Sequence, residues 1–335
     1  MSNLELSQTK QTRFHLSLDM HPLEMLYLIL ENIGLTILTL GLYYPWAYAK
    51  KSRYLWNCIR LNGSAFSYHG TGYELFVGYL KVFIFYICFS LVVQATTHFI
   101  SPQAAIIPTV AVILLFIFYL LPAIIKGAIT FRLRRSSWLS NHFDFKVANS
   151  NWFWTWAKGI VLMPLTLYLY YPAFEFHFTR LTINGLRYKN EQLYFQASLR
   201  DFYRMFFKNI LFTLLTCGLY LPWATVNKQQ FIWAHTSLRE IKFNYTMTGY
   251  QSLKIHLLYL FALPISLGLA YPWVLKYGLE NKLKAIHLNG EIDLFAIAQE
   301  NSSTTTNGAS SEKSTTPSIF EAASRLSDTN IDIGF

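Results

Sequence analysis

Three charged residues lie inside apolar stretches of the sequence, where a charge could do chemistry. Glu31, Lys158 and Lys208 each precede a proline by 14 residues. A charge near the middle of a bilayer is costly unless it is paired or hydrated. We therefore expect Glu31 to face Lys158 or Lys208 across a helix bundle, forming an intramembrane charge network, or to line a polar cavity. The alternative is that Glu31 precedes the start of its span, or that the lysines extend to the membrane surface.

Two further prolines are candidate helix breaks. Pro164 and Pro264 each lie eight residues before another proline, in the similar segments MPLTLYLYYP and LPISLGLAYP. Broken helices in related positions free backbone carbonyls that can coordinate an ion in a transporter. An ordinary proline kink, tolerated inside a membrane helix, is the alternative interpretation.

Catalytic and metal-binding patterns are missing from the sequence. It contains no HExxH, no Walker loop, no GxSxG and no GxGxxG. The three cysteines, Cys58, Cys88 and Cys217, form no CxxC pair and no cluster with zinc spacing. We therefore predict no enzyme activity, no metal site and no cofactor.

The composition is that of a membrane protein. Of 335 residues, 53% are apolar and only 14% are charged, against about 25% charged residues in soluble domains. The apolar residues gather in blocks of about 20, the length needed to cross about 30 Å of hydrocarbon. Six such spans are predicted, at Leu23–Tyr44, Tyr73–Ala95, Ala104–Ile125, Trp152–Tyr171, Met205–Leu221 and Ser252–Val274.

These spans predict an all-α integral membrane protein. A polar N-terminal segment at residues 1–22 precedes a repeat-built transmembrane domain at 23–298, and a disordered Ser/Thr-rich tail covers 299–335. About six transmembrane helices are expected in internal repeats. Short interfacial helices and small β-hairpin-like elements are expected between them.

An internal repeat organises the predicted transmembrane domain. TLGLYYPWAYAKKSRYLWN, which begins at Thr39, matches TCGLYLPWATVNKQQFIWA, which begins at Thr216, in a constant register of 177 residues. The repeated motif comprises Gly41, Tyr44, Pro45, Trp46, Tyr68, Thr71 and Gly72, and in the second copy Gly218, Pro222, Trp223, Tyr245, Thr248 and Gly249. Weaker copies centre on Pro122, Pro172 and Pro272. An aromatic residue follows each of the five prolines by 23 positions, at Tyr68, Phe145, Phe195, Tyr245 and Phe295.

The repeated unit has a physical interpretation. A proline turns or kinks each helix where it reaches the membrane surface, because it cannot donate a backbone hydrogen bond. A basic aromatic segment such as AYAKKSRYLW suits a helix in the headgroup layer. The alternation in AFSYHGTG and KFNYTMTG predicts a short strand, and the Thr-Gly pair that ends each predicts a turn and a helix cap.

The charge distribution favours lipid over nucleic acid as a partner. The net charge is +10, but the basic residues lie in short loops between apolar blocks, so anionic lipid headgroups are the expected partner. The loop TTHFISPQ carries no Lys or Arg and is predicted to lie outside the cell. The segment 173–203 and the segment from 276 onward are basic, although six simple crossings would place them outside. Either successive repeats are inverted, or some spans are re-entrant and all basic loops share one side.

The two motifs resemble a known family. GLYYPWAYAKKSRY followed by LNGSAFSYHGTGYELFVGYLK is similar to the signature of the YjgN-like proteins, a family of bacterial inner-membrane proteins without established activity. GLYLPW and FNYTMTGYQSL form the second copy, which departs from the pattern at Met247, where the first copy has glycine. The resemblance runs from Arg13 to Leu294. It implies a multi-pass location in the bacterial inner membrane and no particular chemistry.

Two functions remain open at this stage. Internal repeats, kinked spans and intramembrane charge favour a transporter or channel-like protein for a small solute. Basic aromatic segments and small β-elements favour a non-transporting scaffold, sensor or assembly factor that binds lipid or protein partners. The fold class alone does not decide between the two.

Overall fold

The structure is a computed structural model that describes residues 12–99, 103, 106–189 and 191–290. These residues belong to one compact unit, Met1–Asp293. The other unit, Leu294–Phe335, lies outside the described residues. The predicted tail at 299–335 and the predicted aromatic position Phe295 are therefore outside the described part of the chain.

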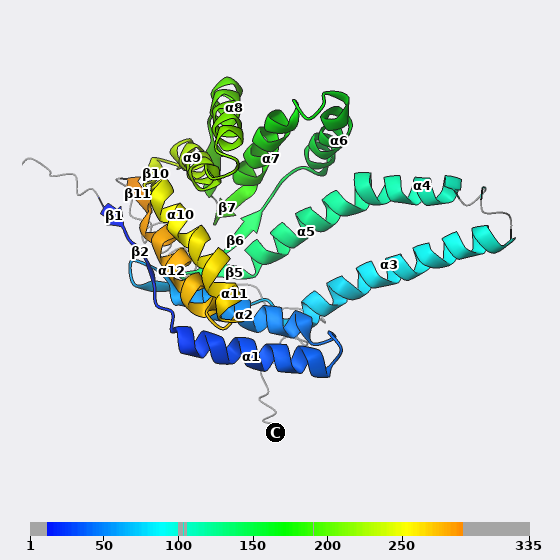
Figure 1. Cartoon of the computed structure of the whole chain (residues 1–335), viewed down its shortest axis with the longest axis horizontal. Coiled ribbons are helices and arrows are strands. Elements are labelled where there is room, and N and C mark those ends of the chain that lie inside the picture. The colour runs from blue at the N-terminus through cyan, green and yellow to red at the C-terminus, as the bar shows by residue number, and fades with distance from the viewer. Residues whose placement is uncertain (1–11, 100–102, 104–105, 190, 291–335) are drawn as a thin grey trace, which may run out of the picture. The chain divides into compact units, whose positions relative to one another are not determined.

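Pairs of helices alternate with short strands along the described chain (Figure 1). The first helices of the five pairs are α1 (Pro22–Leu38), α3 (Gly72–Phe99), α6 (Asn149–Leu165), α8 (Leu199–Leu215), and α10 (Gly249–Leu257) continued by the π-helical η2 (Leu258–Ala262) and by α11 (Leu263–Ile265). The second helices are α2 (Tyr44–Cys58), α4 (Ile106–Leu115) continued through the π-helical η1 (Phe116–Leu120) into α5 (Leu121–Arg134), α7 (Tyr171–Gly185), α9 (Leu221–Ala234) and α12 (Tyr271–Lys284).

Eleven strands of three or five residues connect these pairs within the described residues. They are β1 (Thr12–Phe14), β2 (Leu16–Leu18), β3 (Ile59–Leu61), β4 (Ser64–Tyr68), β5 (Ser136–Trp138), β6 (Asn141–Phe145), β7 (Leu186–Tyr188), β8 (Glu191–Phe195), β9 (Thr236–Leu238), β10 (Ile241–Tyr245) and β11 (Ile286–Gly290). The strands predicted in AFSYHGTG and KFNYTMTG are confirmed as β4 and β10.

The strands form one antiparallel sheet that the N-terminal segment closes into a ring. Strand order is β1-β11-β10-β9-β8-β7-β6-β5-β4-β3-β2. At one end of the sheet β1 pairs with β11, and at the other end β2 pairs with β3. Only His15 separates β1 from β2. The segment Thr12–Leu18 therefore joins the last strand to the first, and we call the closed sheet the strand ring.

The order of the strands fixes where the helices leave the ring. Neighbouring strands are antiparallel and sequential, so successive connections lie at alternate edges. The short turns within β-hairpins all lie at one edge, and all helix pairs leave from the other. The helices themselves also pack in a closed circle, because α1 contacts α12 as well as α2. Between these pairs, Lys51 Nζ donates a hydrogen bond of 3.0 Å to the hydroxyl of Tyr271.

Aromatic side chains at the ends of the strands form much of the core. Tyr68, Phe145, Phe195 and Tyr245 are all buried. Phe195, for example, contacts Phe176 of α7, with ring centroids 5.7 Å apart, within a buried cluster that includes Phe202 of α8. Aromatic pairs of this kind contribute about 0.5–1.5 kcal/mol beyond the area that they bury. The repeated aromatic position thus fixes each strand against the helices beside it.

The repeated prolines begin the second helices. Each lies in the first turn of its helix, where the missing N–H costs nothing. Four of them, all but Pro122, follow a tight turn that includes residues with positive φ, such as Leu40 and Gly41. Before Pro122 the helix instead runs on from the π-helical segment η1.

The predicted fold class, an all-α protein with six spans, is wrong. The chain carries an eleven-stranded sheet, and only two described helical segments are long and apolar enough to cross a membrane: Gly72–Ala95 and Ile106–Arg134. The six apolar blocks were predicted from length and hydropathy, but four of them run through the tight turn between the two helices of a pair. Each of those blocks covers one short helix, the turn after it and the beginning of the next helix, instead of one long helix.

Candidate functional site

In every helix pair a charged residue on each helix borders an uncharged stretch that includes the turn or loop between the two helices. On the first helices these residues are Glu31, Lys81, Lys158, Lys208 and Lys254, and on the second helices Lys50, Lys126, Glu175, Lys228 and Lys276. Between the two members of each pair the sequence contains no Asp, Glu, Lys or Arg. These uncharged stretches are 32–49, 82–125, 159–174, 209–227 and 255–275. We call the ten residues the charge belt, since they separate the charged and uncharged ends of every helix pair.

The predicted network of Glu31, Lys158 and Lys208 is not brought together. Glu31 forms an ion pair with Lys50 of the neighbouring helix at 3.1 Å, and both side chains are partly exposed. Lys158 lies over the ring of Trp154 in its own helix, 5.1 Å from the centroid. Lys208 is exposed on α8. The three residues therefore lie on different helix pairs, without contacting one another.

A second acid in the belt forms an ion pair that the sequence analysis missed. Glu175 of α7 pairs with Lys228 of α9, and the Glu175 side chain is only 14% exposed. Beside this pair, Asn209 accepts a hydrogen bond of 3.0 Å from Asn227. Glu175 stands three residues after Pro172, and Lys228 stands six residues after Pro222. The sequence analysis compared only charges at equal distances from their prolines, so it did not pair these two residues.

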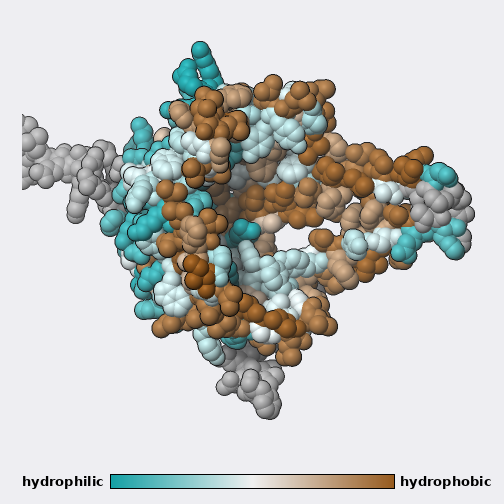
Figure 2. All heavy atoms as spheres, viewed as in Figure 1, coloured by the Kyte–Doolittle hydropathy of each residue, from teal (hydrophilic) through white to brown (hydrophobic). Residues whose placement is uncertain are grey.

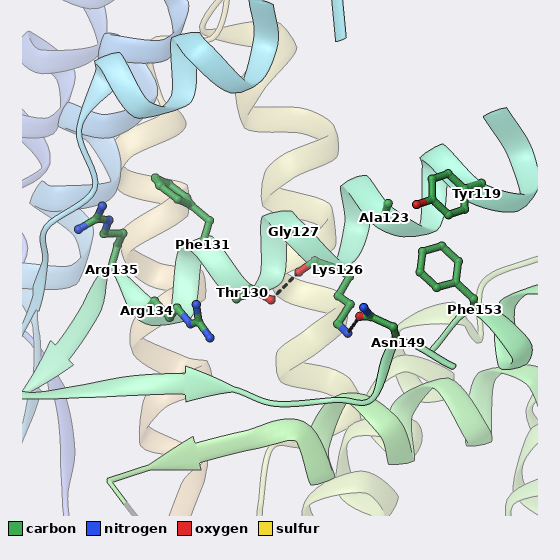
Figure 3. A pocket seen from close by; sticks show the side chains of 10 residues that line it. All are labelled: Tyr119, Ala123, Lys126, Gly127, Thr130, Phe131, Arg134, Arg135, Asn149 and Phe153. Carbon is green, nitrogen blue, oxygen red and sulfur yellow. Dashed lines mark hydrogen bonds between the residues drawn. The ribbon is translucent and has the colours of Figure 1, made fainter. Parts of the chain in front are cut away.

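A cleft with cationic side chains lies beside α5, and we call it the basic cleft (Figure 3). Lys126, Thr130 and Arg134 follow one another at four-residue spacing, so they share one face of the helix. Lys126 Nζ donates to the carbonyl of Val147 and to the side-chain oxygen of Asn149, at the start of α6. The volume of the cleft is about 720 Å³. A smaller cavity of about 460 Å³ shares Lys126, Thr130 and Arg134 and adds Lys146.

One carboxylate contacts two cationic side chains at one end of this cleft. Asp144 of β6 accepts from Arg134 Nε at 2.8 Å and lies 3.4 Å from Lys146 Nζ. Burial raises the pKa of Asp144, but the hydrogen bonds from Arg134 and from the Phe145 N–H outweigh it, so the net pKa is below its ordinary value. Three cations, Lys126, Arg134 and Arg135, line the cleft. Arg134 pairs with Asp144 and Arg135 pairs with Glu74, and no ion pair of the described residues includes Lys126. The electrostatic potential of the cleft suits an anion.

Two tryptophans of α6 hold the wall of the cleft in place. Trp152 Nε1 donates to the carbonyl of Pro122 at 2.8 Å, and Trp156 Nε1 donates to the carbonyl of Ile117 at 2.9 Å. The π-helical segment η1 and the proline disturb the regular ladder of this helix, which leaves carbonyls to be satisfied by other donors. The indoles supply those donors and fix α6 against α5.

Comparison with known proteins identifies the family of this chain. The family described as "Bacterial protein of unknown function (DUF898)" matches residues 22–208 and 190–264, which is more than half of the chain. The chain belongs to this family. The resemblance to YjgN-like proteins is confirmed as well.

Two curated relatives of this DUF898 protein have the same name, "Inner membrane protein YjgN". The one from Salmonella typhimurium is 33% identical over 146 residues, covering 42% of this chain and 33% of that protein. The one from Escherichia coli strain K12 is 39% identical over 87 residues, covering 26% of this chain and 21% of that protein. The matched segment thus spans a third or less of these relatives. No solved structure matches.

The motif residues of the DUF898 chain come together across repeats of the fold. Gly72, the first residue of α3, lies against Trp46 of α2, and Gly249 lies against Trp223 in the same way. Thr248 caps α10 through a reciprocal pair of hydrogen bonds with Gln251, which confirms the predicted helix cap. Both copies of the motif therefore join a second helix to the helix pair that follows it.

The two predicted helix breaks lie near helix ends. Pro164 is the penultimate residue of α6, and Pro264 is the middle residue of the three-residue α11, directly after the π-helical η2. Both prolines thus come directly before a tight turn, beyond the charge belt. Among the described residues no group of three His, Cys, Asp or Glu side chains could hold a metal ion.

Proposed function

We propose that this protein is a lipid-binding scaffold of the bacterial inner membrane, embedded by one transmembrane helix pair and four half-depth helix pairs. In this arrangement the strand ring lies at the cytoplasmic surface. The two curated relatives are named inner membrane proteins, which supports this location. The observation that carries the proposal is the exposed apolar surface of the four tight turns, each of which joins the two helices of a short pair.

The four turns expose apolar side chains almost completely. Leu40 is 94% exposed, Leu267 is 92% exposed and Leu167 is 85% exposed, and leucines surround Cys217 in the fourth turn. Figure 2 shows brown, apolar surface along the helices away from the strands, a teal tip at the right where α3 ends, and much teal, polar surface on the side of the strands. Contiguous exposed apolar surface at such ends is typical of membrane contact.

The backbone N–H groups of these turns donate hydrogen bonds within the protein. In the first turn Gly41 N–H donates to the carbonyl of Thr36 at 2.7 Å, and the Thr39 hydroxyl accepts from the N–H of Tyr43 at 3.0 Å. Equivalent bonds recur in the other three turns, where Thr166, Thr216 and Ser266 take the place of Thr39. Hydrocarbon offers no hydrogen bonds, so internal satisfaction of this kind is required there.

The charge belt sets how deep each helix pair can enter. From Glu31 to the end of α1 at Leu38 is about 11 Å at 1.5 Å per residue, less than one leaflet of a hydrocarbon core about 30 Å thick. From Lys81 to Phe99 in α3 is about 27 Å, and from Ile106 to Lys126 is about 30 Å. Only the pair α3 and α4–α5 is therefore long enough to cross. This supports the re-entrant topology, with all basic segments on one side.

Such a topology favours the scaffold over the transporter. Two crossing helices offer little from which to line a solute pathway. Four short helix pairs in one leaflet instead provide extensive contact with the lipids of that leaflet. The positive-inside rule supports a cytoplasmic position for the basic strand ring, because the loop between α3 and α4 carries no Lys or Arg.

Cysteine accessibility tests the arrangement. In a variant without Cys58, Cys88 and Cys217, single cysteines replace Lys189, Arg239 or His98, and intact cells are treated with a membrane-impermeant maleimide. We expect labelling at position 98 alone, with positions 189 and 239 labelled only after lysis. Inverted repeats would instead expose position 189 and protect position 239, and that result would overturn the proposal.

The turns themselves provide a second test. A cysteine at Leu40 or Leu267 should resist the maleimide in intact cells and in opened membranes, because lipid covers it on both sides. Labelling of position 40 from outside would mean that the pair α1–α2 crosses the bilayer.

A further inference from the structure

We propose that the basic cleft binds the phosphate headgroup of an anionic glycerophospholipid of the cytoplasmic leaflet. This inference rests on the proposed function, since it needs the charge belt to lie at the membrane surface. Lys126 is the first charged residue after the uncharged stretch 82–125. The cleft therefore opens at the border between hydrocarbon and headgroups.

The ends of the cleft match the two ends of a lipid. Figure 3 shows Tyr119 and Phe153 at one end of α5 and Arg134 at the other, with Lys126 between them. The rings of Tyr119 and Phe153 are stacked, with centroids 5.2 Å apart. Acyl chains would lie along this aromatic wall, and the phosphate would lie between Lys126 and Arg134.

Charge complementarity selects an anion as the occupant. Lys126 donates to two neutral oxygens, and no carboxylate of the described residues forms an ion pair with it. In two other helix pairs the belt lysine has an acid, as in Lys50 with Glu31 and Lys228 with Glu175. A partly buried ammonium group without a counter-charge is costly near lipid. A lipid phosphate supplies that counter-charge, together with acceptors for Arg134.

Direct binding measurements test the site. The full chain in a neutral detergent is titrated with dioctanoyl-phosphatidylglycerol, dioctanoyl-phosphatidylcholine or inorganic phosphate in an isothermal calorimeter. We expect saturable binding of one phosphatidylglycerol and at least about tenfold weaker binding of phosphatidylcholine, because both lipids carry the phosphate but the choline ammonium group of phosphatidylcholine would lie beside Lys126 and Arg134, where like charges repel. Equal binding of the two lipids would overturn the proposal. Competition by inorganic phosphate at the concentrations at which the lipid binds would assign the cleft to a soluble anion instead.

Matched variants locate the site. Lys126→Gln and Arg134→Gln should each weaken phosphatidylglycerol binding about tenfold or more, while Lys126→Arg should keep it. Lys208→Gln removes the same charge from the exposed belt on α8 and should leave the affinity within about twofold. Equal effects of Lys126→Gln and Lys208→Gln would contradict the cleft as the site, and circular dichroism confirms that each variant is folded. Because topology is measured separately by labelling, loss of this site would leave the scaffold proposal intact.

Discussion

Gly72, the first residue of α3, packs directly against the indole ring of Trp46 in α2. A β-carbon built on Gly72 would overlap both the ring and the backbone of Trp46. The same relationship joins Gly249 to the indole of Trp223. The two halves of the repeated motif are thus the two sides of one close contact between successive helix pairs.

Substituting alanine for Gly72 should therefore destabilise the protein by more than about 1 kcal/mol, as overpacking of a tight contact does. The matched control is Gly78→Ala in the same helix, where a β-carbon meets nothing within 4 Å. That change should be neutral or stabilising, since alanine is the better helix former by about 1 kcal/mol. Thermal unfolding in detergent compares the two, and equal melting temperatures would contradict the packing argument.

The side-chain hydroxyl groups in the four tight turns of the short helix pairs should also affect stability. In Thr216→Val the N–H of Tyr220 loses its acceptor at 3.0 Å, and a buried unsatisfied donor costs about 1–3 kcal/mol. The control is Thr182→Val, because that hydroxyl only donates to the carbonyl of Phe178 within α7. We expect a lower melting temperature for Thr216→Val than for Thr182→Val. The reverse order would mean that water reaches the turn.

Closure of the strand ring depends on seven residues near the N-terminus. Deleting residues 1–18 removes β1 and β2, and with them the partners of β11 and β3. We expect faster amide hydrogen exchange in Ile286–Gly290 and Ile59–Leu61, because both become unpaired sheet edges. Deleting residues 1–10 leaves both strands in place and should not change exchange there. Unchanged exchange in the longer deletion would show that the ring does not need this segment.

Local features of this fold follow from the sequence because they depend on a few neighbouring residues. The strand at β10 follows from alternation, and the cap at Thr248 follows from the preference of threonine for that position. The closed strand ring could not be predicted from the sequence, because its closure pairs β1 with β11, which are separated by nearly the whole described chain. Strands of three residues, such as β5, are also too short for a period of two to be recognised.

The error in the number of spans has a particular cause. Windows of 20 apolar residues ran through turns such as that at Leu40 and Gly41, where the backbone has positive φ. Glycine at such positions often marks a turn, but leucine does not. The candidate site was missed for a similar reason, because Lys126, Arg134 and Lys146 become neighbours only when β6 and α6 fold back against α5.

The partner of Glu31 can be decided by exchanging charges. We expect Glu31→Lys combined with Lys50→Glu to restore the stability that Glu31→Lys loses, because these two groups lie 3.1 Å apart. Glu31→Lys combined with Lys208→Glu should give no recovery. The effects should be below about 1 kcal/mol, since both partners are partly exposed. Recovery with Lys208→Glu, and none with Lys50→Glu, would support the intramembrane network instead.

A histidine beside the strand ring should make stability depend on pH. Nε2 of His69 lies 2.9 Å from the hydroxyl of Ser137, and its ring is 5.5 Å from that of His142. Burial, followed by the charges of His142, Arg53 and Arg135, lowers the pKa of His69 below its ordinary 6.5. The folded protein therefore resists protonation at this ring more than the unfolded chain does.

The sign of the pH dependence follows from this difference. The stabilisation is fully present above the unfolded pKa of 6.5 and is lost as the pH falls through the lowered folded value. We expect the melting temperature to drop between about pH 7 and pH 5, and to drop less in His69→Gln. Burial, with Arg180 and Lys158, also lowers the pKa of His177, so His69→Gln with His177→Gln should reduce the drop further. The control is His98→Gln, measured in the same way. If the melting temperature of His69→Gln depends on pH as that of the parent protein does, the pKa of His69 does not change on unfolding.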